Sequence, residues 1–149
     1  MIYREIKGDL FTAPRDNILV HCISADHAMG AGIAKKFTEM GIKDAIAGYC
    51  RPWKGVGYAF FACSKFCPWY VMNLVTKEKY WMKPTYTTLR QSLEEMKNIL
   101  SVMNKTFKGK ISMPRIGCGL DRLEWNKVRE IVQEVFKDTD VKIVVYIKE

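Results

Sequence analysis

The chain has 149 residues, of which 48% are hydrophobic and 27% charged, and its formal net charge is +8. This length is typical of one domain, and the composition is that of a soluble globular protein. No apolar run approaches the roughly 18 residues that cross a bilayer, and the N-terminal stretch lacks the apolar core of a signal peptide. We therefore expect a single, monomeric, intracellular domain over residues 1–149 without membrane contact. We expect it in the cytoplasm, with the nucleus as the alternative in a eukaryotic host.

Short apolar runs alternate with helical patterns along the chain. Runs rich in β-branched and aromatic residues predict strands at Ile18–Ile23, Tyr58–Cys63, Tyr70–Val75, Lys110–Met113 and Val141–Ile147, with a weaker candidate at Ile2–Ile6. Apolar spacings of three and four predict helices from Gly30 to Gly41, from Pro84 through Met103, and from Trp125 to Lys137. The segment Gly41–Gly57 fits a short helix and a loop. This alternation indicates an α/β fold around a central sheet.

Two glycine-bearing loops follow predicted strands. The first contains Met29-Gly30-Ala31-Gly32-Ile33-Ala34, and the second contains Arg115-Ile116-Gly117-Cys118-Gly119-Leu120. Glycine allows a backbone to approach a ligand closely, and the helix after such a loop offers free N–H groups to phosphate oxygens. Neither loop is a P-loop, because no Gly-Lys-Ser/Thr follows. Neither is a dinucleotide fingerprint, because Lys35 and Arg122 stand where its last glycine would be. Together the loops predict a cleft that grips a diphosphate.

Few residues of the predicted cleft can carry chemistry. Lys77 ends the Tyr70–Val75 strand and Asp121 closes the second loop, so both are expected at the carboxyl edge of the sheet. The alternatives are a surface lysine in a charged run and an acid that caps the following helix. His21 is expected to be a packed core histidine, and His27 a loop residue that most often has no ligand role. The residues alone predict an α/β protein that binds an anionic, nucleotide-like ligand.

Cysteine spacing and charge add weaker constraints. The five cysteines show no framework spacing, and Cys63-x-x-x-Cys67 has no second pair to complete a tetrahedral metal site. We expect reduced thiols, no metal and no cofactor. The basic residues are scattered, which fits a solvated surface, although an anionic ligand or a partner associated with nucleic acid stays open.

Taken together, these segments resemble a macro domain, the ADP-ribose-binding module, and within it the terminal ADP-ribose protein glycohydrolase branch. The resemblance runs from Lys7 to Tyr146 and is carried by Lys7-Gly8-Asp9-Leu10-Phe11, His21-Cys22-Ile23-Ser24, the first loop, Val75-Thr76-Lys77, Lys83-Pro84-Thr85-Tyr86 and Ser112 through Trp125. It implies a three-layer α/β/α sandwich on a six-stranded mixed sheet. The Asn-Ala-Asn signature of the metal-independent hydrolase branch is absent, which disfavours the water-activating mechanism of that branch.

The resemblance also implies roles for individual residues. Asp9 and Leu10 would lie at the adenine and Ser24 near the distal ribose. The diphosphate and distal ribose would be enclosed by Met29, Gly30, Ala31, Gly32, Ile33, Ala34, Arg115, Ile116, Gly117, Cys118, Gly119 and Leu120. Lys77 would attack the anomeric carbon of the distal ribose to form a lysyl–ADP-ribose intermediate, with Lys79 as a second candidate. Asp121 would accept protons and help resolve the adduct.

The implied activity is a mono-ADP-ribosyl hydrolase that releases ADP-ribose from acidic side-chain esters, with nucleobases and O-acetyl-ADP-ribose as further substrates. Its expected partners are ADP-ribose and ADP-ribosylated protein, with ADP-ribosylated nucleic acid as a further candidate. Two other functions stay open: a reader that binds ADP-ribose without cleaving it, and an ADP-ribose-1″-phosphate phosphatase. The segment Gly41–Pro68 departs from the family pattern, and Tyr80-Trp81-Met82 stands where relatives are more basic.

Overall fold

The computed structural model describes residues 1–48, 55–107 and 109–148. Within them, six strands form one sheet in the order β1-β6-β5-β2-β4-β3. Their bounds are β1 Ile2–Lys7, β2 Ile18–Ser24, β3 Ala59–Ala62, β4 Val71–Lys77, β5 Lys110–Met113 and β6 Lys142–Ile147. Neighbouring strands run parallel except for β3, which pairs antiparallel with β4. The predicted six-stranded mixed sheet is confirmed.

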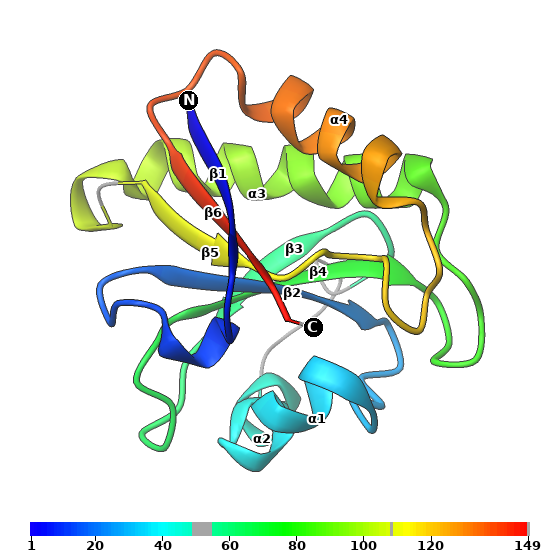
Figure 1. Ribbon diagram of the computed structural model, residues 1–149. Coiled ribbons are helices and arrows are strands. Elements are labelled where there is room, and N and C mark those ends of the chain that lie inside the picture. The colour runs from blue at the N-terminus through cyan, green and yellow to red at the C-terminus, as the bar shows by residue number, and fades with distance from the viewer. Residues whose placement is uncertain (49–54, 108, 149) are drawn as a thin grey trace.

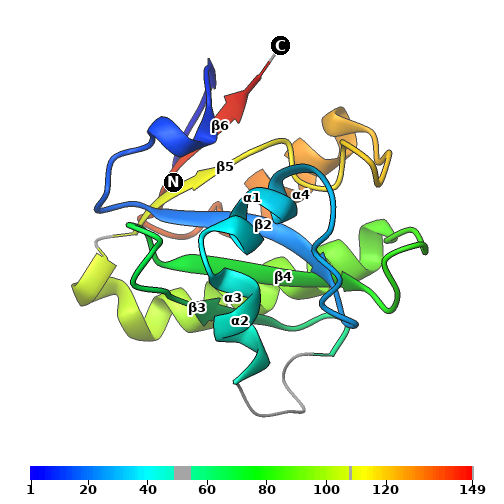
Figure 2. The same cartoon turned by 90° about the horizontal axis from the view of Figure 1, so that it is seen from below.

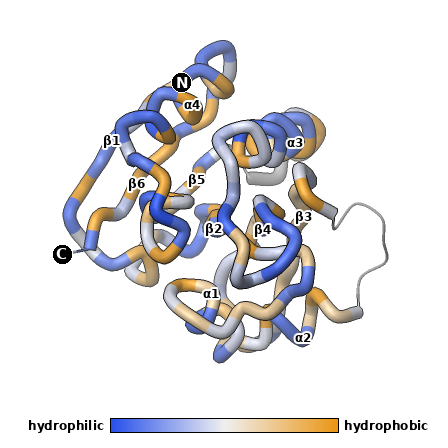
Figure 3. The backbone as a smooth tube through the Cα atoms, turned by 90° about the vertical axis from the view of Figure 1, so that its right-hand side faces the viewer, coloured by the Kyte–Doolittle hydropathy of each residue, from blue (hydrophilic) through white to orange (hydrophobic). Residues whose placement is uncertain are grey.

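Helices cover both faces of the sheet. The pair α1 (Gly32–Glu39) and α2 (Ile42–Ala47) lies on one face, and the pair α3 (Tyr86–Phe107) and α4 (Trp125–Phe136) lies on the other (Figures 1 and 2). A short 3-10 turn, η1 (Leu10–Thr12), follows β1. Hydrophobic and hydrophilic stretches alternate along α3 and α4 (Figure 3), as expected of helices with one face on a sheet and one in solvent. The three-layer α/β/α architecture is as predicted.

Side-chain alternation in the central strands supplies two cores. In β2, Ile18 and Val20 join the core under α3 and α4, whereas Leu19 joins the core under α1 and α2. In β4, Met72 belongs to the first core and Val71 to the second. Because successive side chains in a strand point to opposite faces, a strand covered on both faces is apolar over most of its length. This explains why β2 and β4 appear in the sequence as nearly continuous apolar runs, interrupted by the buried His21 and Asn73.

The predicted elements are present, with small shifts at their ends. Strand β4 extends two residues past the predicted Val75, so that Lys77 is its last residue. Gly41 adopts a φ of 83° between α1 and α2, so it ends the first of these helices as predicted. Helix α2 is the short helix expected within Gly41–Gly57, but residues 49–54 of that segment, including Cys50, lie outside the described residues. None of the helices in the described ranges combines the length and apolarity needed to cross a bilayer.

The edge strand β1 is fastened to α4 by one carboxylate. Glu5 accepts hydrogen bonds from Arg129 Nε at 2.5 Å and Arg129 Nη2 at 3.0 Å, and also from the Tyr3 hydroxyl and Trp125 Nε1. The Arg129 bond is the main cause that lowers the pKa of Glu5 to about 2; burial opposes it, and the bonds from Tyr3 and Trp125 add to it. The ionised Glu5 therefore stabilises the folded state.

Replacing Glu5 with glutamine is expected to lower the free energy of unfolding by about 1–3 kcal/mol at pH 7, since a charged acceptor of several hydrogen bonds is lost. The pKa of Glu5 is lowered from 4.5 to about 2, so its contribution is complete above 4.5 and is lost as the pH falls toward 2. Urea denaturation should therefore show the difference between wild type and variant narrowing over this range. Glu134→Gln is the matched control, because its bond to Arg90 is exposed and should contribute about 1 kcal/mol at most. An equal loss in both variants would contradict this account.

Candidate active site

A cavity of about 1050 Å³ lies at the carboxyl ends of β2, β4 and β5. Both glycine-bearing loops and the segment after β4 line it. Of the residues predicted for the site, it brings together Ser24, Met29, Gly30, Ala31, Gly32, Ile33, Ala34, Lys77, Arg115, Ile116, Gly117, Gly119, Leu120 and Asp121. This volume is at the upper end of what a small-molecule site usually needs. The position, at the edge where three parallel strands end, is where α/β proteins bind ligands.

Three predicted residues are absent from the described lining of this cavity. The Asp9 carboxylate caps η1 by accepting a hydrogen bond from Phe11 N at 2.9 Å, and Lys148 Nζ lies 3.5 Å from its other oxygen. Leu10 is buried in the core under α1 and α2. The Cys118 thiol donates to the Ile116 carbonyl at 3.4 Å. The assignment of Asp9 and Leu10 to the adenine stays a prediction.

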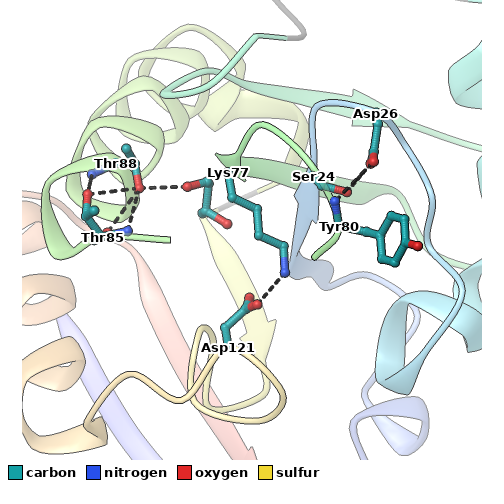
Figure 4. Close-up of polar contacts among 8 residues, drawn as sticks. Ser24, Asp26, Lys77, Tyr80, Thr85, Thr88 and Asp121 are labelled. Carbon is teal, nitrogen blue, oxygen red and sulfur yellow. Dashed lines mark hydrogen bonds and ion pairs between the residues drawn. The ribbon is translucent and has the colours of Figure 1, made fainter. Parts of the chain in front are cut away.

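Lys77 and Asp121 form an ion pair in this cavity. Lys77 Nζ lies 2.5 Å from Asp121 Oδ1 although the residues come from β4 and from the second loop (Figure 4). Their side chains are only 14% and 16% exposed. An ammonium in direct contact with a carboxylate can transfer a proton to it without rearrangement, which leaves a neutral amine. The pair therefore has the geometry of a nucleophile and its base.

The end of β4 that carries Lys77 is fixed by the start of α3. Thr85 caps this helix through a reciprocal pair of bonds, in which each of Thr85 and Thr88 donates its N–H to the hydroxyl of the other at 3.0 Å. The Thr88 hydroxyl also donates to the Thr76 carbonyl at 2.7 Å (Figure 4). Ala25 N bonds the carbonyl of Lys77 itself at 2.8 Å. The Lys77 backbone is thus held from both neighbouring elements, which limits where its amine can reach.

The first loop leaves the start of α1 open to an anion. Ala31 is the N-cap and provides no side-chain hydrogen bond to the first turn. The first N–H groups of the helix are therefore available, and they border the cavity through Gly32, Ile33 and Ala34. Met29 adopts a φ of 48° and is held there by the Thr38 hydroxyl, which donates to its carbonyl at 2.9 Å. These open N–H groups are compatible with the predicted diphosphate, and its binding here stays a prediction.

The second loop depends on glycine at one position. Gly117 has a φ of 73°, and a Cβ added there would lie 3.0 Å from Leu123 Cδ1. Leu123 N donates to the Gly117 carbonyl at 2.8 Å, which folds the loop back on itself. Any other residue at Gly117 would combine backbone strain with this close contact. The conformation places Asp121 beside Lys77.

Asp26 organises the site but was not predicted as a site residue. Its Oδ1 accepts from the Ser24 hydroxyl and from Ala28 N, and its Oδ2 accepts from Tyr80 N at 3.0 Å (Figure 4). Burial alone would raise its pKa, but the bonds from Ser24, Tyr80 and Ala28 outweigh this effect and lower the pKa of Asp26. Asp26 therefore joins the loop after β2 to the loop after β4. The bond to Ala28 could have been predicted, because an aspartate in a turn often accepts a hydrogen bond from the backbone N–H two residues later. The bond to Tyr80 could not, because it joins residues 54 positions apart.

Other groups near the cavity are poorly suited to nucleophilic roles. Burial raises the pKa of the Cys22 thiol strongly, and it raises that of Cys118 to about 11, so both stay protonated at neutral pH. His21 is buried, with its ring 4.3 Å from that of Phe37 and its Nε2 2.7 Å from Asn73 Oδ1. Burial lowers the pKa of His21 to about 4, in keeping with the predicted packed histidine. In the described part of the chain, no group of three or more histidine, cysteine or acidic side chains is arranged to hold a metal ion.

Comparison with known proteins identifies the family of this chain. No protein-family model matches it. The chain is 46% identical to the ADP-ribose glycohydrolase OARD1 of Bos taurus and 44% identical to that of Homo sapiens; each match covers 95% of this chain and 88% of the relative. Its fold is similar to the macrodomain of Mycobacterium tuberculosis DarG, with a TM-score of 0.78, 21% identity and 97% of both chains covered. The chain therefore belongs to the ADP-ribose glycohydrolase OARD1 family of macrodomain proteins.

Proposed function

We propose that this protein is an ADP-ribosyl hydrolase that releases ADP-ribose from acidic side chains of modified proteins through a covalent adduct on Lys77. The observation that carries the proposal is the ion pair between Lys77 and Asp121 inside the cavity. A reader that only binds ADP-ribose has no need of an amine and a carboxylate 2.5 Å apart at the site of the ligand. The name of the relatives, ADP-ribose glycohydrolase, supports a hydrolase.

The two loops would bind the substrate. The open N–H groups at the start of α1 and the backbone around Gly117 and Gly119 line the cavity from two sides, which suits a diphosphate between them. Arg115 and Arg122 add positive charge to the same lining. With the diphosphate held in this way, the distal ribose would lie over Lys77 and Asp121. Such positioning turns attack by the lysine into an intramolecular step.

The proposed reaction has two steps. In the first, Asp121 takes a proton from the Lys77 ammonium, and the freed Nζ electron pair attacks the anomeric carbon of the distal ribose. The bond from that carbon to the ester oxygen breaks, and the acidic side chain leaves as a carboxylate with the bonding electrons. In the second, water adds to the same carbon, the carbon–Nζ bond breaks, and protons pass through Asp121 so that the lysine amine and free ADP-ribose are regenerated.

Mass spectrometry under denaturing conditions tests this mechanism directly. After incubation with an ADP-ribosyl-glutamate peptide or with ADP-ribose and rapid quenching, we expect a covalent ADP-ribose adduct that maps to Lys77. A protein that releases ADP-ribose from the peptide while carrying no adduct on any lysine would contradict the covalent mechanism. Tight binding without release would leave a reader, and phosphate release from ADP-ribose-1″-phosphate would indicate the phosphatase instead.

A further inference from the structure

Three exposed apolar residues follow the lysine strand at the mouth of the cavity. The mouth segment, Tyr80–Met82, has side chains that are 65%, 71% and 39% exposed and that contribute to the cavity lining. Leu120 of the second loop lines the same cavity and is 73% exposed. Exposed tyrosine, tryptophan and methionine are enriched where proteins bind other molecules. Gathered at one cavity, they mark a binding surface.

The backbone of the mouth segment is held in place. Tyr80 N donates to Asp26 Oδ2 at 3.0 Å, and Met82 N donates to the Lys79 carbonyl at 3.0 Å. Pro84, two residues after the segment and two before α3, is buried. A surface that is already ordered loses little conformational entropy when it binds a partner. The exposed side chains of the mouth segment are therefore carried by a backbone that is already held in place.

The charge around the mouth segment is positive. Two exposed lysines, Lys79 and Lys83, flank the segment in the sequence. Two exposed arginines, Arg115 and Arg122, line the same cavity. Two nearby carboxylates are already engaged, since Asp121 pairs with Lys77 and Asp26 accepts three hydrogen bonds. Glu78 is exposed in the same stretch, but the four cations outnumber it. The surface is thus complementary to an acidic partner.

We propose that the mouth segment binds the polypeptide on either side of the modified residue, and that it favours an acidic acceptor sequence. The inference rests on the proposed function, because the leaving group starts at the carbon that Lys77 attacks and Tyr80 is three residues beyond Lys77. Since Lys77 and the mouth segment line the same cavity, the inference places the leaving chain against this segment. Tyrosine and tryptophan beside arginines are typical of the central contacts of protein interfaces, and methionine is enriched there as well. Proteins that bind single-stranded nucleic acid stack successive bases on aromatic rings. Met82 and Leu120 have no ring for a base to stack on, so this surface fits a polypeptide better.

The double variant Tyr80→Ala/Trp81→Ala tests this inference. We compare kcat/KM for an ADP-ribosyl-glutamate peptide with acidic flanks against kcat/KM for O-acetyl-ADP-ribose, which has no polypeptide. The ratio of the two should fall by about 10–30-fold, as expected for two interface residues of this kind. The wild type should also show a lower kcat/KM for a peptide whose flanking acids are replaced by glutamine, because the surrounding lysines and arginines would no longer meet opposite charge. Phe66→Ala is the matched control, because Phe66 is 67% exposed and lies away from the cavity lining.

Binding measurements separate this inference from the proposed function. In a Lys77→Arg background, calorimetry should show that the modified peptide binds more tightly than ADP-ribose, and that the double variant removes most of this difference. Equal losses for peptide and ADP-ribose would overturn the inference, as would a loss confined to an ADP-ribosylated oligonucleotide. Failure of the wild type to hydrolyse either substrate would contradict the proposed function, while the binding difference would still decide the role of the mouth segment.

Discussion

Replacing Lys77 with arginine is expected to lower the hydrolysis of an ADP-ribosyl-glutamate peptide by about 10³-fold or more, the scale on which enzymes lose activity when a covalent nucleophile is removed. Arginine keeps the positive charge beside Asp121 and so preserves the ion pair at the floor of the cavity. Its guanidinium stays protonated at any accessible pH and cannot act as a nucleophile. The variant therefore removes the chemistry while retaining the electrostatics. Calorimetry with ADP-ribose should show a dissociation constant within about threefold of wild type.

The choice of arginine makes the result interpretable. Lys77→Ala would leave the Asp121 carboxylate without its partner in a site that is only 16% exposed, so a loss of activity could reflect a rearranged loop. Lys79→Ala is the informative companion, because Lys79 is the neighbouring candidate for the nucleophile. A large loss in Lys79→Ala together with an active Lys77→Arg would show that the nucleophile has been assigned to the wrong lysine.

The strands and helices were predictable because each is driven by a local pattern. The apolar spacing in α4 predicted a helix whose buried side chains are Val128, Ile131, Val132, Val135 and Phe136, and these are the residues the structure buries. Strands β2 and β4 were predictable because both faces are covered, which makes most of their residues apolar. The order of the strands in the sheet cannot be predicted from such local patterns, because it pairs strands that are far apart in the chain. The resemblance to macro domains supplied the six-stranded mixed sheet.

Contacts between segments far apart in the chain were harder to predict. Glu5 and Arg129 are separated by 124 positions, and neither residue stands out in the sequence. Asp26 resembles an ordinary turn residue, and its bond to Tyr80 appears only when the loops after β2 and β4 are brought together. The meeting of Lys77 and Asp121 could be predicted, because Lys77 ends β4 and Asp121 lies in the loop after β5. Both strands run parallel to β2, so their carboxyl ends share one edge of the sheet.

The exposure of the mouth segment also could not be predicted from the sequence. Trp81 is 71% exposed whereas Trp69 is buried, although both stand beside other aromatic residues. Trp69 packs against the segment after η1, where its indole N–H donates to the carbonyls of Ala13 and Pro14, each at 3.2 Å. These partners allow the indole to be buried without leaving its N–H unpaired. Local composition cannot distinguish the two cases, since the contacts that bury Trp69 come from residues more than fifty positions away.

Replacing Asp121 with asparagine is expected to lower kcat for the same peptide by about 10²–10⁴-fold, the usual contribution of a positioned proton acceptor. Asparagine has nearly the shape of aspartate and still offers an oxygen that can accept a hydrogen bond from Lys77, but it cannot take up the proton. Because Asp121 is proposed to act on Lys77 and water, the binding of ADP-ribose should change little. The loss should therefore lie in kcat, with KM altered by less than about threefold.

The matched control for this variant is Asp16→Asn, which alters another aspartate–lysine pair. Asp16 Oδ2 lies 2.8 Å from Lys110 Nζ, but the two side chains are 60% and 36% exposed, and neither lines the cavity. Removing one charge from such a pair should change stability by about 1 kcal/mol at most and should leave kcat within about twofold of wild type. If Asp121→Asn instead raised KM and preserved kcat, Asp121 would be a ligand-binding residue, and the proton from Lys77 would need another acceptor. A loss of kcat with unchanged KM is the result that the proposed role of Asp121 as proton acceptor predicts, because that role is exercised during the reaction and not in binding.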